Sequence, residues 1–184
     1  SSLLMTMMYS MHQSGFWNLE RQTNLLDGAA HFYDTYECID GKYISIGSIE
    51  PQFYSLLCEI AELSEEDFGD QMKRDTWADK KKLIRDVFLT KTRDDWCSLM
   101  EGTDVCFAPV LDMSEAPNHP HNVARQTFIE LEGVIQPAPA PRFDRTENEI
   151  QLPPAIAGEH SKEILETLGM NQDEVDDLLS SLGF

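Results

Sequence analysis

The most constraining feature of the sequence is a hairpin pattern that runs directly into the start of a helix. Residues 32–39 and 42–46 alternate between apolar and polar side chains on either side of an Asp-Gly dipeptide, which is typical of a tight β-turn. The second segment leads to Glu50-Pro51, and proline is favoured at the first position of a helix. We therefore predict an antiparallel hairpin followed by a helix, with Glu50 at the joint.

Two interpretations of Glu50 follow from this position. An acidic residue just before Pro51 interacts favourably with the partial positive charge of a helix N-terminus, so Glu50 can be an electrostatic cap. Functional residues are also often held at the ends of rigid elements, so Glu50 can be a reacting group. The local sequence alone favours the cap and leaves the catalytic role as the alternative.

The charge of the chain limits its partners. There are 14 Lys and Arg residues against 33 Asp and Glu residues, a formal net charge of −19. Nucleic acids and anionic membrane surfaces are bound by basic patches, so neither is expected as a partner. No segment has the roughly 20 apolar residues of a membrane-spanning helix. A phosphate-bearing ligand would need cationic groups from elsewhere.

The cysteines and histidines give no metal motif. The four cysteines are widely spaced without a Cys-x-x-Cys pair, which indicates free thiols in a reducing compartment: Cys38, Cys58, Cys97 and Cys106. His119 and His121 flank a rigid proline and have no carboxylate or cysteine close by, so a metal site is not expected there.

The first 17 residues carry leucines and methionines at helical spacing up to Gly15. Core packing is the simpler interpretation of this stripe, and a deformable wall against an apolar ligand is the alternative, because methionine is flexible. The segment lacks the basic start and small-residue cleavage pattern of a signal peptide. We expect it to be the end of a helix that begins in a longer protein.

The rest of the chain predicts an α+β fold: a small domain with a hairpin-based antiparallel sheet and several helices, followed by a proline-rich arm and C-terminal helices. The predicted helices are 51–63, a capped turn after Ser64, 80–91, 92–102, 161–168 and 173–182. Further strands are predicted at 105–111, with Pro109 at an edge or bulge, and at 128–134. Residues 137–154 are too rich in proline for regular structure.

Two segments together carry a family resemblance. Residues 24–36 read Asn-Leu-Leu-Asp-Gly-Ala-Ala-His-Phe-Tyr-Asp-Thr-Tyr, and residues 47–54 read Gly-Ser-Ile-Glu-Pro-Gln-Phe-Tyr. The pair resembles the C-terminal half of the alpha-methylacyl-CoA racemases, members of the family III CoA-transferase superfamily. Residues 101–111, 139–142 and 158–165 also match, in the family's order. The Ile-Glu-Pro-Gln-Phe-Tyr stretch at 49–54 is specific to racemase-like members, whereas the C-terminal pattern is shared across the superfamily.

The resemblance implies a racemase acting in lipid metabolism on 2-methyl-branched fatty acyl and bile acid CoA thioesters. The α-proton is removed to give an enolate and returned on the opposite face, which requires two acid/base groups. In the family these are an aspartate and a histidine that is oriented by a glutamate, here Glu50. The histidine and aspartate are expected outside this chain, in a large N-terminal domain. None of the five histidines matches the family's motif: His12, His31, His119, His121 and His160.

The resemblance also implies an acyl-chain surface, a domain organisation and a homodimer. Met8, Met11, Leu25 and Ile49 are the expected substrate-binding residues. Residues 1–30 would be the end of a large-domain helix and a linker, 31–136 the small domain, and 137–184 an arm returning to the large domain. Family members form interlocked homodimers and need no cofactor, since coenzyme A belongs to the substrate. The implied location is intracellular: mitochondria or peroxisomes in an animal, cytoplasm in a bacterium.

Two alternatives to the racemase stay open. One is a family III CoA-transferase, in which an upstream aspartate forms a covalent adduct. The other is a non-catalytic dimerisation module. The 184-residue chain alone is expected to be inactive, because its proton-transfer partners lie elsewhere.

Overall fold

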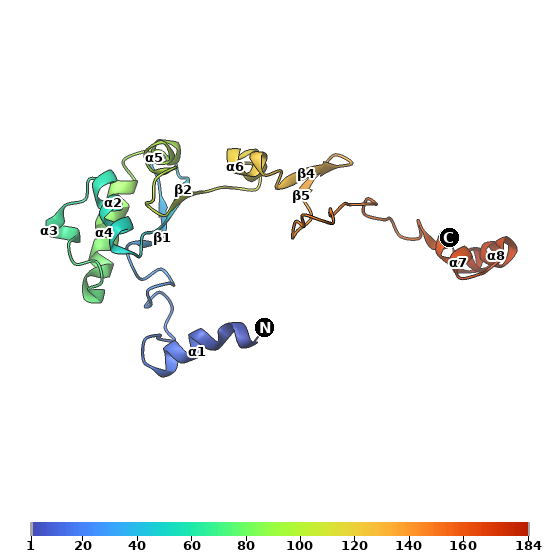
Figure 1. The fold of residues 1–184 in the computed structure, drawn as a ribbon, viewed down its shortest axis with the longest axis horizontal. Helices are drawn as coiled ribbons and strands as arrows, with labels where there is room; N and C mark the ends of the chain where they lie inside the picture. The colour runs from blue at the N-terminus through green and yellow to red at the C-terminus, as the bar shows by residue number, and fades with distance from the viewer. Residues whose placement is uncertain (1, 184) are drawn as a thin grey trace. The chain divides into compact units, whose positions relative to one another are not determined.

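A computed structural model describes residues 2–183 of the chain. It divides into two compact units, Ser1–Asp112 (unit 1) and Met113–Phe184 (unit 2), each described by itself (Figure 1). The described residues form eight α-helices, a three-stranded sheet and a two-stranded sheet, all strand pairs being antiparallel. The predicted α+β class is confirmed. The assignment of residues 1–30, 31–136 and 137–184 to parts of a larger protein stays a prediction.

The sheet of unit 1 contains the predicted hairpin. Strands β1 (Tyr33–Glu37), β2 (Tyr43–Gly47) and β3 (Phe107–Val110) lie in the order β1-β2-β3. The turn between β1 and β2 places Gly41 at φ +73°, a left-handed conformation that glycine adopts at little cost. Pro109 pairs with Ile44 in β3, an edge strand, as expected for a residue that has no N–H to donate.

Four helices of unit 1 pack with the hairpin: α2 (Pro51–Ile60), α3 (Glu65–Phe68), α4 (Trp77–Phe88) and α5 (Arg93–Met100). Helix α4 begins three residues before the predicted start at Lys80. Trp77, Lys80, Ile84 and Phe88 are the buried residues of this helix. The predicted start was late because the charged Lys80 separates Trp77 from the apolar residues that follow in the sequence. The Lys80 stem is buried while its Nζ donates to the Asp70 carbonyl at 2.7 Å.

The core of unit 1 lies between the sheet and these helices. Its fully buried side chains come from the hairpin region and from three helices: Phe32, Ile44, Leu57, Ile84, Phe88 and Trp96. The rings of Phe88 and Trp96 meet edge to face with centroids 5.1 Å apart, and the Trp96 indole N–H donates to the Phe88 carbonyl. This contact fixes α5 against the end of α4.

The N-terminal segment is helical but adds nothing to that core. A 3-10 turn (Ser2–Met5) precedes α1 (Thr6–Gln13), and Gly15 follows with φ +78°, so the predicted helix and its end are confirmed. Neither element buries a residue, and Leu3 and Leu4 are 88% and 86% exposed. The interpretation of this stripe as core packing is therefore wrong for the part of the chain that the structure describes.

Unit 2 contains a second hairpin that the sequence did not reveal. Its elements are a 3-10 turn (Ala116–Asn118), α6 (Pro120–Ala124), β4 (Phe128–Leu131), β5 (Val134–Pro137), α7 (Ser161–Thr167) and α8 (Gln172–Leu182). The prediction of one strand over 128–134 is wrong, because Glu132 and Gly133 both have positive φ, 49° and 81°, and form a tight turn. Residues 138–154 contain no helix or strand, as predicted for the connector, whereas Pro137, its predicted first residue, is the last residue of β5.

The terminal helices of unit 2 are confirmed. Asn171 opens α8 with a capping box: its side chain accepts from the Glu174 N–H, and Glu174 accepts from the Asn171 N–H. Across residues 2–183, no helix is both long enough and apolar enough to cross a bilayer.

Candidate functional site

Glu50 sits at the N-cap position of α2, where β2 has ended and the helix begins. Its backbone is extended, with φ −72° and ψ 144°, and its carbonyl accepts from the Tyr54 N–H at 3.0 Å. Its side chain makes no capping hydrogen bond and is exposed. Pro51 begins the helix and has no N–H that requires a cap. The joint therefore sets the backbone position of Glu50, while its carboxylate makes no capping hydrogen bond to the helix.

The backbone immediately before Glu50 is anchored by buried side chains. Ser48 is fully buried; its Oγ donates to the Val105 carbonyl at 2.6 Å, and its N–H donates to the Phe32 carbonyl at 3.0 Å. The Gln71 side-chain amide donates to the carbonyls of Ser48 and Ile49, both at 2.9 Å. Gln71 could not be found from the sequence, because it lies more than 20 residues from the joint in a segment without periodicity.

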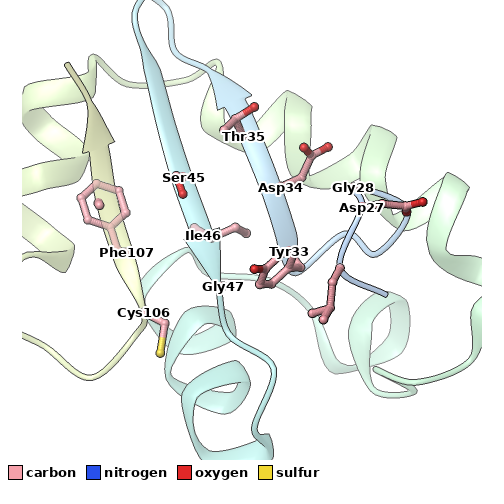
Figure 2. Close-up of a pocket in the computed structure, with 12 residues that line it drawn as sticks. Asp27, Gly28, Tyr33, Asp34, Thr35, Ser45, Ile46, Gly47, Cys106 and Phe107 are labelled. Carbon is pink, nitrogen blue, oxygen red and sulfur yellow. The ribbon is translucent and has the colours of Figure 1, made fainter. Parts of the chain in front are cut away.

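A pocket of about 470 Å³ opens on the sheet of unit 1, at the end where Glu50 lies. The β1–β2–β3 register places Tyr33 opposite Gly47, and Ser45 between Thr35 and Ala108. Figure 2 shows Gly47 and Cys106 at the same end of this sheet. A Cβ on Gly47 would lie 3.6 Å from the Tyr33 ring, an ordinary contact. The glycine therefore leaves room in the pocket that a larger side chain would fill.

The Cys106 thiol connects this pocket with Glu50. Cys106 lines the pocket, and its carbonyl accepts from the Gly47 N–H at 2.9 Å. Partial burial raises the pKa of the Cys106 thiol, and the negative charges of Glu50 and Asp104 raise it further. The charge of Glu50 thus influences the pKa of a thiol that lines the pocket.

The four residues predicted to bind an acyl chain do not gather at this pocket. Leu25 and Ile49 pack against the core of unit 1, whereas Met8 and Met11 are half-buried residues of α1. Leu26, next to Leu25, lines the pocket. The acyl-binding role of the four residues stays a prediction. The sequence could not predict which residues line the pocket, because they are brought together by the pairing of strands β1, β2 and β3.

His31 is the fully buried histidine beneath the site, and it is unsuited to proton transfer. The Tyr54 hydroxyl donates to the Phe68 carbonyl at 2.9 Å, so it accepts from the Nε2–H of His31 at 2.7 Å. Burial lowers the pKa of His31 to about 3, and the nearby Lys80 charge acts in the same direction. A histidine that stays neutral at physiological pH and has no route to solvent serves the packing of the core.

No group of three or more histidine, cysteine, aspartate or glutamate side chains within residues 2–183 is arranged to hold a metal ion.

Residues 1–161 match the model of CoA-transferase family III. The chain belongs to this family.

Within this family, the chain is similar to two curated racemases. The chain is 39% identical over 178 residues to the alpha-methylacyl-CoA racemase of Mus musculus, and this alignment covers 95% of the chain and 46% of the mouse protein. It is 38% identical over 183 residues to the alpha-methylacyl-CoA racemase of Homo sapiens, covering 98% of the chain and 48% of the human protein. The chain thus spans about half the length of the curated relatives it matches.

A solved structure gives the same fold. The crystal structure of Rv3272 from M. tuberculosis matches with a TM-score of 0.61 at 17% identity, over 85% of this chain and 41% of that one. At this identity the likeness shows the fold alone. It is consistent with the mixed α+β architecture observed here.

Proposed function

We propose that the chain is the C-terminal part of a racemase that inverts the α-carbon of 2-methyl-branched acyl-CoA thioesters. The observation that carries the proposal is Glu50, an exposed carboxylate that makes no capping hydrogen bond, in a chain 38–39% identical to alpha-methylacyl-CoA racemases. Isomerisation needs no oxidant or co-reactant, because one base removes a proton from one face of the α-carbon and a second acid delivers a proton to the other face. No cofactor is proposed beyond the coenzyme A that the substrate carries.

In this proposal Glu50 is a positioning residue for a histidine base in the other half of the protein. A carboxylate that accepts the N–H of an imidazole fixes its tautomer and raises its basicity. The exposed position of Glu50 leaves it open to such a partner, whereas His31 is buried and already bonded to Tyr54. As the resemblance to racemases implies, the histidine base is expected in the half of the protein outside this chain.

The pocket beside Glu50 is the proposed contact surface for the acyl part of the substrate near its α-carbon. Tyr33 and Phe107 provide two aromatic rings on an open face, and Gly47 leaves space beside the Tyr33 ring. The chain's net charge of −19 disfavours binding of the CoA phosphates here, so these groups would be bound by the other half of the protein. Met8, Met11, Leu25 and Ile49 stay proposed acyl contacts.

The decisive experiment measures exchange of the α-proton of a 2-methylacyl-CoA in D₂O, catalysed by the full-length protein. We expect Glu50→Gln to slow exchange by about 100-fold or more, because the amide cannot hold a charged imidazole. Glu59→Gln is the matched control, since Glu59 is an exposed glutamate of the same helix. Equal rates for the two variants would reject the assignment of Glu50.

The isolated 184-residue chain is expected to show no exchange above the uncatalysed rate. Exchange catalysed by this chain alone would show that the proton-transfer groups lie within it, contrary to the proposal.

CoA transfer is the second candidate function, favoured by membership of CoA-transferase family III. It is separated from racemisation by supplying the full-length protein with a carboxylic acid acceptor and following formation of the new thioester. Transfer in place of α-proton exchange would replace the racemase proposal.

A homodimer of the full-length protein is also proposed, and light scattering is its test. A chain that self-associates and has neither activity would be a dimerisation module.

A further inference from the structure

We propose that Gln71 is a positioning residue of the racemase site, setting the direction in which Glu50 leaves the joint. The inference rests on the proposed function of Glu50. Gln71 lies between α3 and α4, and nothing in the sequence connects it with the Ile49-Glu50-Pro51 segment. The hydrogen bonds of Gln71 in the folded chain connect it with this segment.

The Gln71 amide spans the two peptide carbonyls immediately before Glu50. Its Nε2 donates to the Ser48 carbonyl at 2.9 Å and to the Ile49 carbonyl at 2.9 Å. A primary amide nitrogen has two hydrogens, so these bonds use its whole donor capacity. The orientation of the amide is determined by the partners, because a carbonyl oxygen can only accept a hydrogen bond.

This contact occurs where regular backbone pairing has ended. β2 stops at Gly47, and the Ile49 N–H turns back to the Gly47 carbonyl at 2.9 Å. α2 begins at Pro51, so the Ser48 and Ile49 carbonyls belong to neither element. The Ile49 carbonyl is part of the peptide unit that joins Ile49 to Glu50. Fixing its direction restricts rotation on the N-terminal side of Glu50.

Gln71 is itself held firmly enough to act as a support. It is 9% exposed, and its backbone carbonyl accepts the indole N–H of Trp77 at 2.8 Å. Trp77 is buried in the core at the start of α4. The direction of Glu50 is thus transmitted from the core through Trp77 and Gln71 to the joint, while Ser48 fixes the same joint to Val105 from the other side.

Glutamine is the residue type that fits position 71, because the contact needs two N–H donors on a side chain of this length. Methionine has a similar length but no donor, so Gln71→Met leaves both carbonyls without this partner. Glutamate has the same shape but presents oxygens, so Gln71→Glu places acceptors against acceptors. Asparagine keeps the amide on a shorter stem and cannot span both carbonyls from the same backbone position. These variants separate loss of the two hydrogen bonds from loss of volume.

The first measurement is NMR on the 184-residue chain and does not depend on catalysis. We expect Gln71→Met to shift the amide signals of Ile49 and Glu50 and to broaden or move the side-chain carboxyl signal of Glu50. Ile84→Val is the control: it removes a methyl group from the buried face of α4, away from the joint. If Gln71→Met fails to fold, Gln71→Asn supplies the same test. Unchanged Glu50 signals in a folded Gln71 variant would overturn the inference.

The second measurement is α-proton exchange by the full-length protein. We expect Gln71→Met to lower kcat by at least about tenfold with little change in KM, because misplacing a positioning group by a fraction of an ångström affects chemistry more than binding. A role in stability alone predicts that Gln71→Met and Ile84→Val behave alike, which would overturn the inference. Failure of the proposed function is distinguishable, because Glu50→Gln would then leave exchange unaffected whatever Gln71 does.

Discussion

The hydroxyl of Tyr54 lies 2.7 Å from Nε2 of His31 and donates to the carbonyl of Phe68 at 2.9 Å. One residue of α2 is therefore bonded both to the segment before β1 and to the end of α3. The Tyr54 N–H also donates to the Glu50 carbonyl, which closes the first turn of α2. The joint is built on a buried polar network as well as on apolar packing.

Removing the Tyr54 hydroxyl is expected to destabilise unit 1. In Tyr54→Phe the buried Nε2–H of His31 and the Phe68 carbonyl both lose their partner, and an unpaired buried polar group costs about 1–3 kcal/mol. Urea denaturation should show this decrease in the free energy of unfolding. Tyr43→Phe is the control, because Tyr43 is 44% exposed on β2. Equal stability of the two variants would contradict the role given to the network.

The neutral state of His31 makes stability depend on pH in a defined direction. Burial lowers the pKa of His31 from 6.5 to about 3, so between these pH values the unfolded chain binds a proton that the folded chain does not. Stability from this group is therefore complete above pH 6.5 and is lost as the pH falls, by up to about 1.4 kcal/mol per pH unit. Urea titrations at pH 7 and pH 5 should show the decrease.

NMR separates His31 from the carboxylates that also titrate at low pH. The ring signals of His31 should not move between pH 8 and pH 4.5. A His31 midpoint near 6.5 would show that the imidazole reaches solvent, and the buried network would then be wrong.

Local signals were sufficient to predict most of unit 1. The Asp-Gly turn, Pro51 at the first helical position and Thr92 before two acidic residues each describe a single short segment, and all three elements are present. The hairpin of unit 2 was missed because its turn places Glu132 in a left-handed conformation, which glycine, asparagine and aspartate favour and which a glutamate does not signal.

The site was only partly visible in the sequence, for a different reason. Glu50 could be found because its neighbours Ile49 and Pro51 form a contiguous motif. Gln71 acts through one side chain placed by tertiary packing, and Cys106 reaches the pocket by strand pairing. Such relationships depend on contacts between distant segments and leave no periodicity in the chain.

The capping box at the start of α5 offers a test of a local contribution. The Thr92 hydroxyl accepts from the Asp95 N–H at 3.1 Å, and the Asp95 carboxylate accepts from the Thr92 N–H at 3.2 Å. Thr92→Ala should lower the free energy of unfolding by about 1 kcal/mol, as measured by urea denaturation. Thr92→Ser keeps the hydroxyl and should retain most of the stability. If serine and alanine were equally destabilising, the hydroxyl would not be responsible.

The thiols should differ in reactivity because access differs among them. Cys38 is 1% exposed and its pKa is raised to about 11 by burial, so it is expected to resist alkylation in the folded chain. Cys106 is exposed, and although its pKa is also raised, it should be the first thiol modified by iodoacetamide. Peptide mass spectrometry of briefly treated protein would identify the site. Cys106→Ala should remove this early modification without altering the protection of Cys38.

Modification of Cys106 should also report on the pocket. An acetamide group on Cys106 occupies space beside Gly47 and close to Glu50, so the full-length protein should lose α-proton exchange in step with labelling. The Cys106→Ala protein should keep its exchange activity under the same treatment, since alanine leaves the pocket open and cannot be alkylated. Full activity after complete labelling of Cys106 would show that substrate does not use this pocket, while the role of Glu50 would still be decided by Glu50→Gln.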